Sequence, residues 1–96
     1  LLFLSPYEGF GLPAAEAMAV GIPTIVADRA SLPEVVGDAG IVVEPNDTER
    51  IVERVRSLRH DRALWARHAE AGRERAQQYT WDRCVNRLIC AFNSIV

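Results

Sequence analysis

The first half of the chain alternates between short apolar runs and segments with helical features. The apolar or β-branched runs, each bounded by glycine, proline or serine, predict three strands at residues 1–4, 23–27 and 40–43. Residues 12–20 predict a helix, because Pro13 suits its first turn and Gly21 the position just past its end. Residues 31–36 predict a second, shorter helix. Strands alternating with helices predict a parallel sheet in a Rossmann-like α/β layer fold.

After Pro45 the apolar positions take on the spacing of amphipathic helices. The first stripe follows Asn46 or Asp47 as an N-cap and consists of Ile51, Val52, Val55 and Leu58. The second consists of Leu64, Trp65, Ala69, Gly72, Ala76 and Tyr79. A third helix, capped by Thr80, carries Val85, Leu88, Ile89, Phe92 and Val96. These trailing helices are expected to lie on or beyond the sheet layer.

Length and charge narrow the classes of protein that fit. The 96 residues make one domain at most, and 49% hydrophobic with 25% charged residues is an ordinary globular composition. A net charge of −2 gives no electrostatic case for binding nucleic acid or an anionic membrane. No apolar run approaches the roughly 18 residues of a transmembrane helix, and no signal peptide is present.

The two cysteines indicate neither a disulfide nor a metal site. Cys84 and Cys90 are six residues apart in a predicted helix, so they lie on different faces and match no metal-ligand spacing. His60 and His68 likewise have no partner at a metal or catalytic spacing. We therefore expect buried, reduced thiols in a cytoplasmic protein that binds no metal.

The apolar strand at the start of the chain also indicates where its neighbouring strands lie. A strand without polar positions belongs in the middle of a sheet that is covered on both faces. Because residues 1–4 stand at the very beginning, the strands beside them are expected to lie upstream. We expect the chain to be a fragment.

Candidate chemistry is concentrated between Ser5 and Gly21. In open parallel sheets, ligands bind where the carboxyl ends of strands meet the amino ends of helices. Gly9 and Gly11 would let a backbone approach a ligand closely, and the N–H groups at a helix start suit a phosphate. The segment is therefore a candidate diphosphate cradle. A Gly-x-Gly taken alone is more typical of a tight turn.

Two glutamates flank this cradle. Glu16 is the one polar side chain of the helix at 12–20, where an unpaired carboxylate among apolar residues would be costly. Side chains on a helix lean toward its N-terminus, so Glu16 could bind the hydroxyls of a ribose at the mouth of the cradle. It could equally be a surface glutamate on the exposed side of the helix. Glu8 could bind ligand hydroxyls or be a solvated loop acid.

These residues together resemble the E-x7-E motif of retaining GT-B glycosyltransferases of family 4, known as group 1. The motif runs from Glu8 to Glu16, and the similarity is dense over residues 1–47. It includes Ser5-Pro6-Tyr7 before the motif, residues 17–27 after it, and then Pro33-Glu34-Val35-Val36 with Gly37, Gly40 and Pro45-Asn46-Asp47. Beyond residue 47 the helices match the family only in pattern.

The resemblance implies a position for each candidate residue. Glu8 would be catalytic and would hydrogen-bond hydroxyls of the donor sugar, with Gly9 allowing close approach. The backbone N–H groups of Phe10, Gly11 and Leu12 would reach the sugar and the diphosphate, and Glu16 would hold the ribose. The family transfers a sugar from UDP, GDP or ADP to an acceptor hydroxyl with retention of configuration, generally without a metal or other cofactor.

The resemblance also implies what these residues lack. Residues 1–96 would be a partial donor-binding domain, the second half of the C-terminal domain of a GT-B fold, without the N-terminal acceptor domain and the basic pair that grips the diphosphate. The family often has Gly-Gly before Pro-Glu, where this chain has residues 28–32.

Two consequences follow for the chain on its own, and one for the full-length enzyme. We expect no sugar transfer by these residues alone, and self-association through a last helix that would otherwise cross onto the N-terminal domain. The full-length enzyme could lie at the inner face of the membrane as a peripheral protein. The alternatives are a truncated module that binds nucleotide or a partner without catalysis, and a generic α/β fragment whose loop binds nothing.

Overall fold

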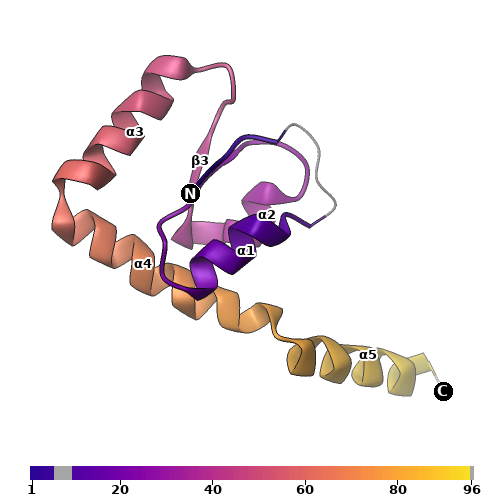
Figure 1. Cartoon of the computed structure of the whole chain (residues 1–96). Helices are drawn as coiled ribbons and strands as arrows, with labels where there is room; N and C mark the ends of the chain where they lie inside the picture. Colours follow the sequence, from indigo (N-terminus) through magenta and orange to yellow (C-terminus); the bar gives the residue numbers. More distant parts are fainter. Residues whose placement is uncertain (6–9, 96) are drawn as a thin grey trace.

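The computed structural model describes residues 1–5 and 10–95 and contains a three-stranded parallel sheet (Figure 1). The strands are β1 (Leu2–Phe3), β2 (Ile25–Ala27) and β3 (Ile41–Val43), in the order β1-β2-β3. The register pairs Leu2 with Ile25 and Phe3 with Val26, and then Ile25 with Ile41 and Val26 with Val42. The predicted parallel α/β layer is confirmed.

The middle strand is β2, and helices cover both faces of the sheet. All three residues of β2 are buried. Val26 belongs to a core cluster with α1 (Leu12–Ala19) and α2 (Leu32–Val36), whereas Ile25 packs with Ile51 and Leu58 of α3 (Thr48–His60). Successive side chains of a strand point to opposite faces. Helices α1 and α2 therefore cover one face and α3 the other (Figure 1).

The first strand departs from the prediction. Leu1 and Leu2 are 42% and 47% exposed, because β1 is at the edge of the sheet and pairs only with β2. The burial expected for residues 1–4 is therefore not seen among these three strands; the prediction placed the remaining neighbours of this strand upstream.

Glycines lie just before and just after helix α1. Gly11 precedes it with a positive φ of 82°, and Gly21 follows it with a φ of 78°. At its end the N–H of Gly21 donates to the carbonyl of Met18, and the N–H of Ile22 to that of Ala17. This pair of hydrogen bonds forms a Schellman motif, which needs the left-handed residue that glycine supplies.

The later helices start at acidic or hydroxyl caps. The carboxylate of Asp47 accepts from the N–H of Arg50, and the hydroxyl of Thr80 accepts from that of Arg83, so both predicted N-caps are confirmed. Asp61, which the pattern did not single out, accepts from Leu64 N–H and separates α3 from α4 (Arg62–Ala76). Short 3₁₀ turns follow α2 and α4, η1 (Gly37–Ala39) and η2 (Gln77–Tyr79).

Helix α4 packs on α1 and α3, and its stripe is largely as predicted. Ala69 and Gly72 are buried, with Gly72 facing Met18 of α1, and Tyr79 packs against the first core cluster. His68 contacts the carbonyl of Ala39 through Nδ1 at 2.9 Å. Trp65 is exposed, so this member of the predicted stripe is wrong.

The last helix, α5 (Trp81–Ile95), extends away from the rest of the chain (Figure 1). All of its side chains from Asp82 to Ile95 are exposed. Cys84 and Cys90 are free thiols as expected, but the prediction that they are buried is wrong, because α5 continues past the body that could cover them. Val96 lies outside the described residues.

Candidate functional site

The carboxyl end of β1 and the start of α1 lie at the edge of the sheet where ligands of parallel sheets bind. The described part consists of Ser5 and of the residues from Phe10 onward. Glu8 and Gly9, two of the predicted site residues, lie outside the described residues. Gly11 and Leu12, by contrast, have defined positions at the start of α1.

Gly11 is required here by backbone shape and by packing. Its φ is 82°, and a Cβ at this position would lie 2.6 Å from Cδ2 of the fully buried Leu32. Its carbonyl accepts from the N–H groups of Ala14 and Ala15, at 3.0 and 3.2 Å. The packing of α2 therefore accounts for the glycine whether or not a ligand approaches.

The start of α1 presents free donors toward the same edge. Pro13 has no N–H, and the N–H groups of Ala14 and Ala15 are occupied by the Gly11 carbonyl. Within residues 1–5 and 10–95, the N–H groups of Gly11 and Leu12 have no hydrogen-bond acceptor. Leu12 is exposed and Gly11 is buried, so of the two residues Leu12 is the one open to solvent at the helix start, where an anion can bind.

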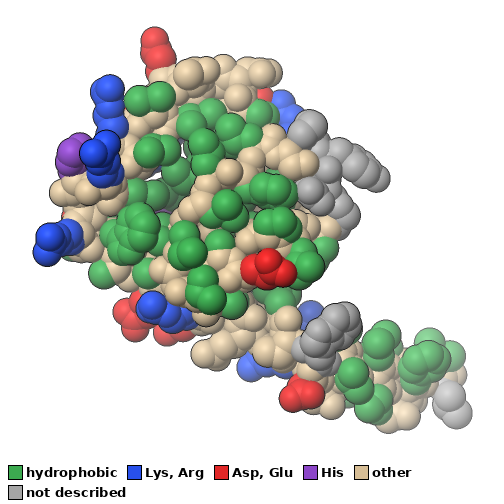
Figure 2. Space-filling view, viewed as in Figure 1, with side chains coloured by type: hydrophobic (Ala, Val, Ile, Leu, Met, Phe, Trp, Pro, Cys, Tyr) green, Lys and Arg blue, Asp and Glu red, His purple; other side chains and the backbone are tan. Residues whose placement is uncertain are grey.

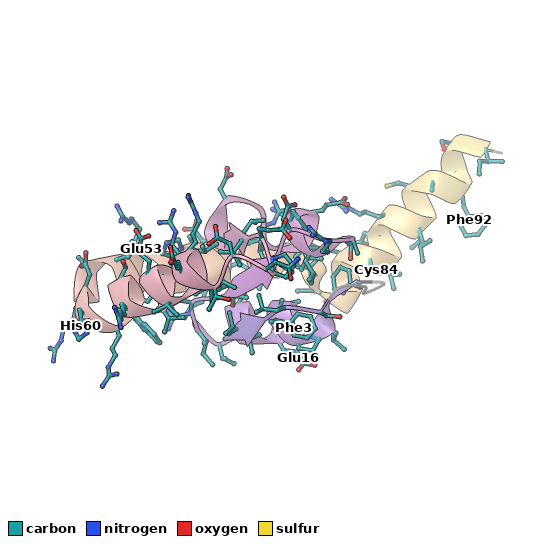
Figure 3. The ribbon with its side chains drawn as sticks, turned by 90° about the horizontal axis from the view of Figure 1, so that it is seen from above. Phe3, Glu16, Glu53, His60, Cys84 and Phe92 are labelled. Carbon is teal, nitrogen blue, oxygen red and sulfur yellow. The ribbon has the colours of Figure 1, made fainter. Side chains whose placement is uncertain are left out.

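Glu16 is exposed and projects away from α1 (Figure 3). In the described part of the chain its carboxylate has no hydrogen-bond or ion-pair partner. The residue is exposed to solvent, so the desolvation cost that singled it out does not apply in the structure. Its exposure suits both a ribose contact and a plain surface position.

Phe10 contacts an aromatic partner from η2, the turn that follows α4. Its ring meets that of Tyr79 edge-on, with centroids 5.1 Å apart and planes at 80°. The Tyr79 hydroxyl donates to the carbonyl of Val35 at 2.8 Å. The guanidinium of Arg75 donates to the carbonyl of Glu34 at 2.6 Å and lies 5.9 Å from the Tyr79 ring centroid. Sequence reasoning placed Tyr79 in a packing stripe and missed this contact, since it joins residues nearly 70 positions apart.

The loop after β2 contains a residue with left-handed backbone. Ala30 has a φ of 50°, which glycine adopts readily and an L-residue does not. The neighbouring Arg29 forms a two-pronged ion pair with Glu44, with Nη1 3.0 Å from Oε2. That hydrogen bond and the charge of Glu44 raise the pKa of Arg29.

A separate apolar pocket of about 650 Å³ lies elsewhere, beside Leu1 and Pro23. These residues are at the amino ends of β1 and β2, so the pocket is on the wrong edge of the sheet for a ligand held at α1. Its remaining walls come from α3, α4 and the strands, namely Leu2, Ile25, Val55, Leu58, Arg59, Arg62 and Trp65.

The described residues contain neither a grouped metal site nor a membrane-spanning helix. In residues 1–5 and 10–95, no three His, Cys, Asp or Glu side chains are grouped as a metal site would need. In the same residues no helix is long and apolar enough to cross a membrane.

Known proteins resemble the chain in sequence and in structure. The model of the family "Glycosyl transferases group 1" matches residues 1–75. The chain is 44% identical over 93 residues to O-antigen chain mannosyltransferase B of Escherichia coli, covering 95% of this chain and 24% of that protein. It is 32% identical over 96 residues to the MMP alpha-(1->4)-mannosyltransferase of Mycolicibacterium hassiacum, covering 96% and 23%.

A solved structure agrees with these relatives. Sucrose-phosphate synthase from Thermosynechococcus elongatus superimposes with a TM-score of 0.80 and 27% identity, over 98% of this chain and 25% of that one. The predicted fold, the second half of the C-terminal domain of a GT-B protein, is thereby confirmed. The chain spans about a quarter of the length of the relatives named here. On the family match over residues 1–75, the chain belongs to the group 1 glycosyltransferases.

Proposed function

We propose that the chain forms the donor half-site of a retaining glycosyltransferase, which moves a sugar from a nucleotide diphosphate to an acceptor hydroxyl. The observation that carries the proposal is the start of α1. Within the described residues the N–H groups of Gly11 and Leu12 have no acceptor, and they lie at the carboxyl edge of a parallel sheet in a chain of the group 1 family. UDP-, GDP- and ADP-sugars are the candidate donors.

Each predicted residue has a part in this proposal. The N–H groups of Phe10, Gly11 and Leu12 bind the diphosphate and the sugar, and the positive end of the α1 dipole stabilises the leaving phosphate. Glu16, exposed on α1, accepts hydrogen bonds from the ribose hydroxyls. Glu8 is the catalytic residue and hydrogen-bonds hydroxyls of the donor sugar, and Gly9 allows the backbone to approach closely. No metal or other cofactor takes part.

Catalysis in this scheme needs more than the chain provides. The acceptor site is assigned to an N-terminal domain of the full-length enzyme, and the cations that grip the diphosphate to parts of that enzyme outside residues 1–96. The full-length enzyme is placed in the cytoplasm or at the inner face of the membrane. Positioning between two domains supplies much of such a rate enhancement. The chain by itself therefore binds donor and transfers no sugar.

The last helix supports an interaction role in addition. Val85, Leu88, Ile89, Phe92 and Ile95 follow helical spacing, and all are at least half exposed. Figure 2 shows hydrophobic side chains gathered along α5. This apolar face docks on the N-terminal domain, and in the isolated chain it pairs with a second copy.

The test of donor binding is an NMR shift titration of the chain with UDP-glucose, GDP-mannose and ADP-glucose. Saturable shifts centred on residues 10–16 are expected with one of them. Glu16→Gln should weaken that binding about ten- to a hundredfold, because hydrogen bonds to a charged group contribute about 1.5–3 kcal/mol. Glu53→Gln, which changes an exposed glutamate on α3, is the matched control and should leave the affinity unchanged.

The outcomes separate the proposals. Shifts that survive Glu16→Gln would remove Glu16 from the site and leave a half-site formed by backbone donors. The absence of any shift at millimolar donor would refute donor binding by this chain and favour the generic α/β fragment. Sugar transfer by the purified chain would contradict the assignment of essential groups to another domain.

A further inference from the structure

A residue outside the family match, Tyr79, contacts Phe10, which lies two residues before α1. The family model ends at residue 75, and Tyr79 lies beyond it. Tyr79 nevertheless contacts Phe10, the residue immediately before Gly11. Phe10 is 42% exposed, so its ring is only partly covered by the body of the protein. In such a position one edge-to-face partner has a large share in fixing where the ring lies.

Tyr79 is itself firmly placed. Its hydroxyl donates to the carbonyl of Val35 at 2.8 Å, and Arg75 donates from Nη2 to Glu34 and from Nε to Val35. These carbonyls belong to the last turn of α2, where carbonyls have no partner within the helix. The same Arg75 lies 5.9 Å from the Tyr79 ring centroid, within the range of a cation–π contact.

The absence of a side chain at Gly37 leaves space for the Arg75 guanidinium. Gly37 follows α2 with a φ of 53°, and a Cβ there would lie 2.8 Å from Cζ of Arg75. A side chain at Gly37 would therefore displace the guanidinium that packs on Tyr79. Thus one end of α4, with η2, holds two segments that follow different strands of the sheet: Phe10 after β1 and the end of α2 after β2.

We infer that Tyr79 is a positioning residue for donor binding, acting through the Phe10 ring on the backbone N–H groups of Phe10, Gly11 and Leu12. The inference rests on the proposed function. A Cβ at Gly11 would overlap Leu32, so the backbone is closely packed on that side, and the Phe10 ring is a further constraint on the direction of these N–H groups. Removing the Tyr79 ring lets the Phe10 ring move. The backbone N–H groups, which must all point at one diphosphate, are then misaligned.

The test is a double-mutant cycle on the full chain, with donor affinity measured by calorimetry. The probe is whichever of UDP-glucose, GDP-mannose and ADP-glucose binds the unmodified chain most tightly. Tyr79→Leu keeps apolar bulk and removes both the ring and the hydroxyl. It is expected to weaken binding about two- to tenfold, the range that corresponds to the loss of an aromatic pair.

The second arm distinguishes positioning from general destabilisation. In a Phe10→Leu background, Tyr79→Leu should cause no further loss of affinity, because the residue through which it acts is gone. Leu58→Ala, in the other core cluster, is the matched control: it lowers stability and should leave donor affinity unchanged. If Tyr79→Leu does not fold, Tyr79→Phe, which removes only the hydroxyl held by Val35, is used in the same cycle with an expected loss of about twofold.

The results bear on two separate statements. If the unmodified chain binds none of the three probes, the proposed function fails and this inference fails with it. If it binds, but Tyr79→Leu binds equally well or causes the same loss in both backgrounds, positioning by Tyr79 is overturned while donor binding stands. Loss in the original background alone supports the inference.

Discussion

Replacing Gly11 by alanine is expected to be among the most damaging small substitutions in this protein. The new Cβ has to adopt a φ of 82° and would lie 2.6 Å from Cδ2 of Leu32. An L-residue in left-handed backbone costs about 1–2 kcal/mol. Relieving the overlap costs about 1–3 kcal/mol more, because Leu32 is fully buried and cannot turn aside without displacing its neighbours.

One term opposes these costs. Alanine lowers the conformational entropy of the unfolded chain relative to glycine, which raises the free energy of unfolding by about 0.4–1 kcal/mol. The net loss of unfolding free energy is therefore about 1–5 kcal/mol, centred near 3. For a domain of this size, total stability is about 5–14 kcal/mol. The substitution would remove a large part of it.

Urea unfolding followed by far-UV circular dichroism measures this loss as a lower midpoint at unchanged slope. Gly72→Ala is the matched control, since a Cβ there meets Met18 at an ordinary 3.4 Å and gains up to about 1 kcal/mol of helix propensity. In a Leu32→Ala background the overlap is absent, so Gly11→Ala should cost only about 1–2 kcal/mol before the opposing term. A Gly11→Ala midpoint indistinguishable from that of the unmodified chain would refute the reasoning.

Two further substitutions test other features. Ala30→Gly should stabilise the chain by about 0.5–1 kcal/mol, because relief of the left-handed alanine outweighs the gain in unfolded-state freedom, and a lower urea midpoint would contradict this. Phe92→Lys should convert self-associating chain to monomer in sedimentation velocity without changing the unfolding of the body, since the side chain is 66% exposed. Equal association of both chains would show that α5 is not the contact.

Local patterns predicted most of the elements because their causes are local. The caps at Asp47 and Thr80 and the glycines around α1 act within one turn of their own helix, and a sequence shows them directly. The parallel sheet followed from the alternation of strands and helices. Asp61 was missed because the apolar stripes run nearly continuously across the break between α3 and α4.

Features that depend on distant parts of the chain were harder to predict. Burial of Cys84 and Cys90 was wrong because an amphipathic pattern shows that a helix has an apolar face but not what covers it. Glu16 was singled out by an assumed burial that the structure does not show. The contact between Phe10 and Tyr79 depends on tertiary packing that no spacing reveals. Glu8 and Gly9 lie outside the described residues and remain predictions.

The exposure of α5 has a consequence for its own helix–coil equilibrium. A helix of 15 residues is close to the length at which isolated helices are marginal in water, and here no packing of residues 82–95 adds to it. Its backbone amides should therefore exchange with solvent far faster than those of α1. Whatever surface covers the apolar face supplies the free energy that completes the helix, so the measured affinity of that contact already includes the cost of ordering α5.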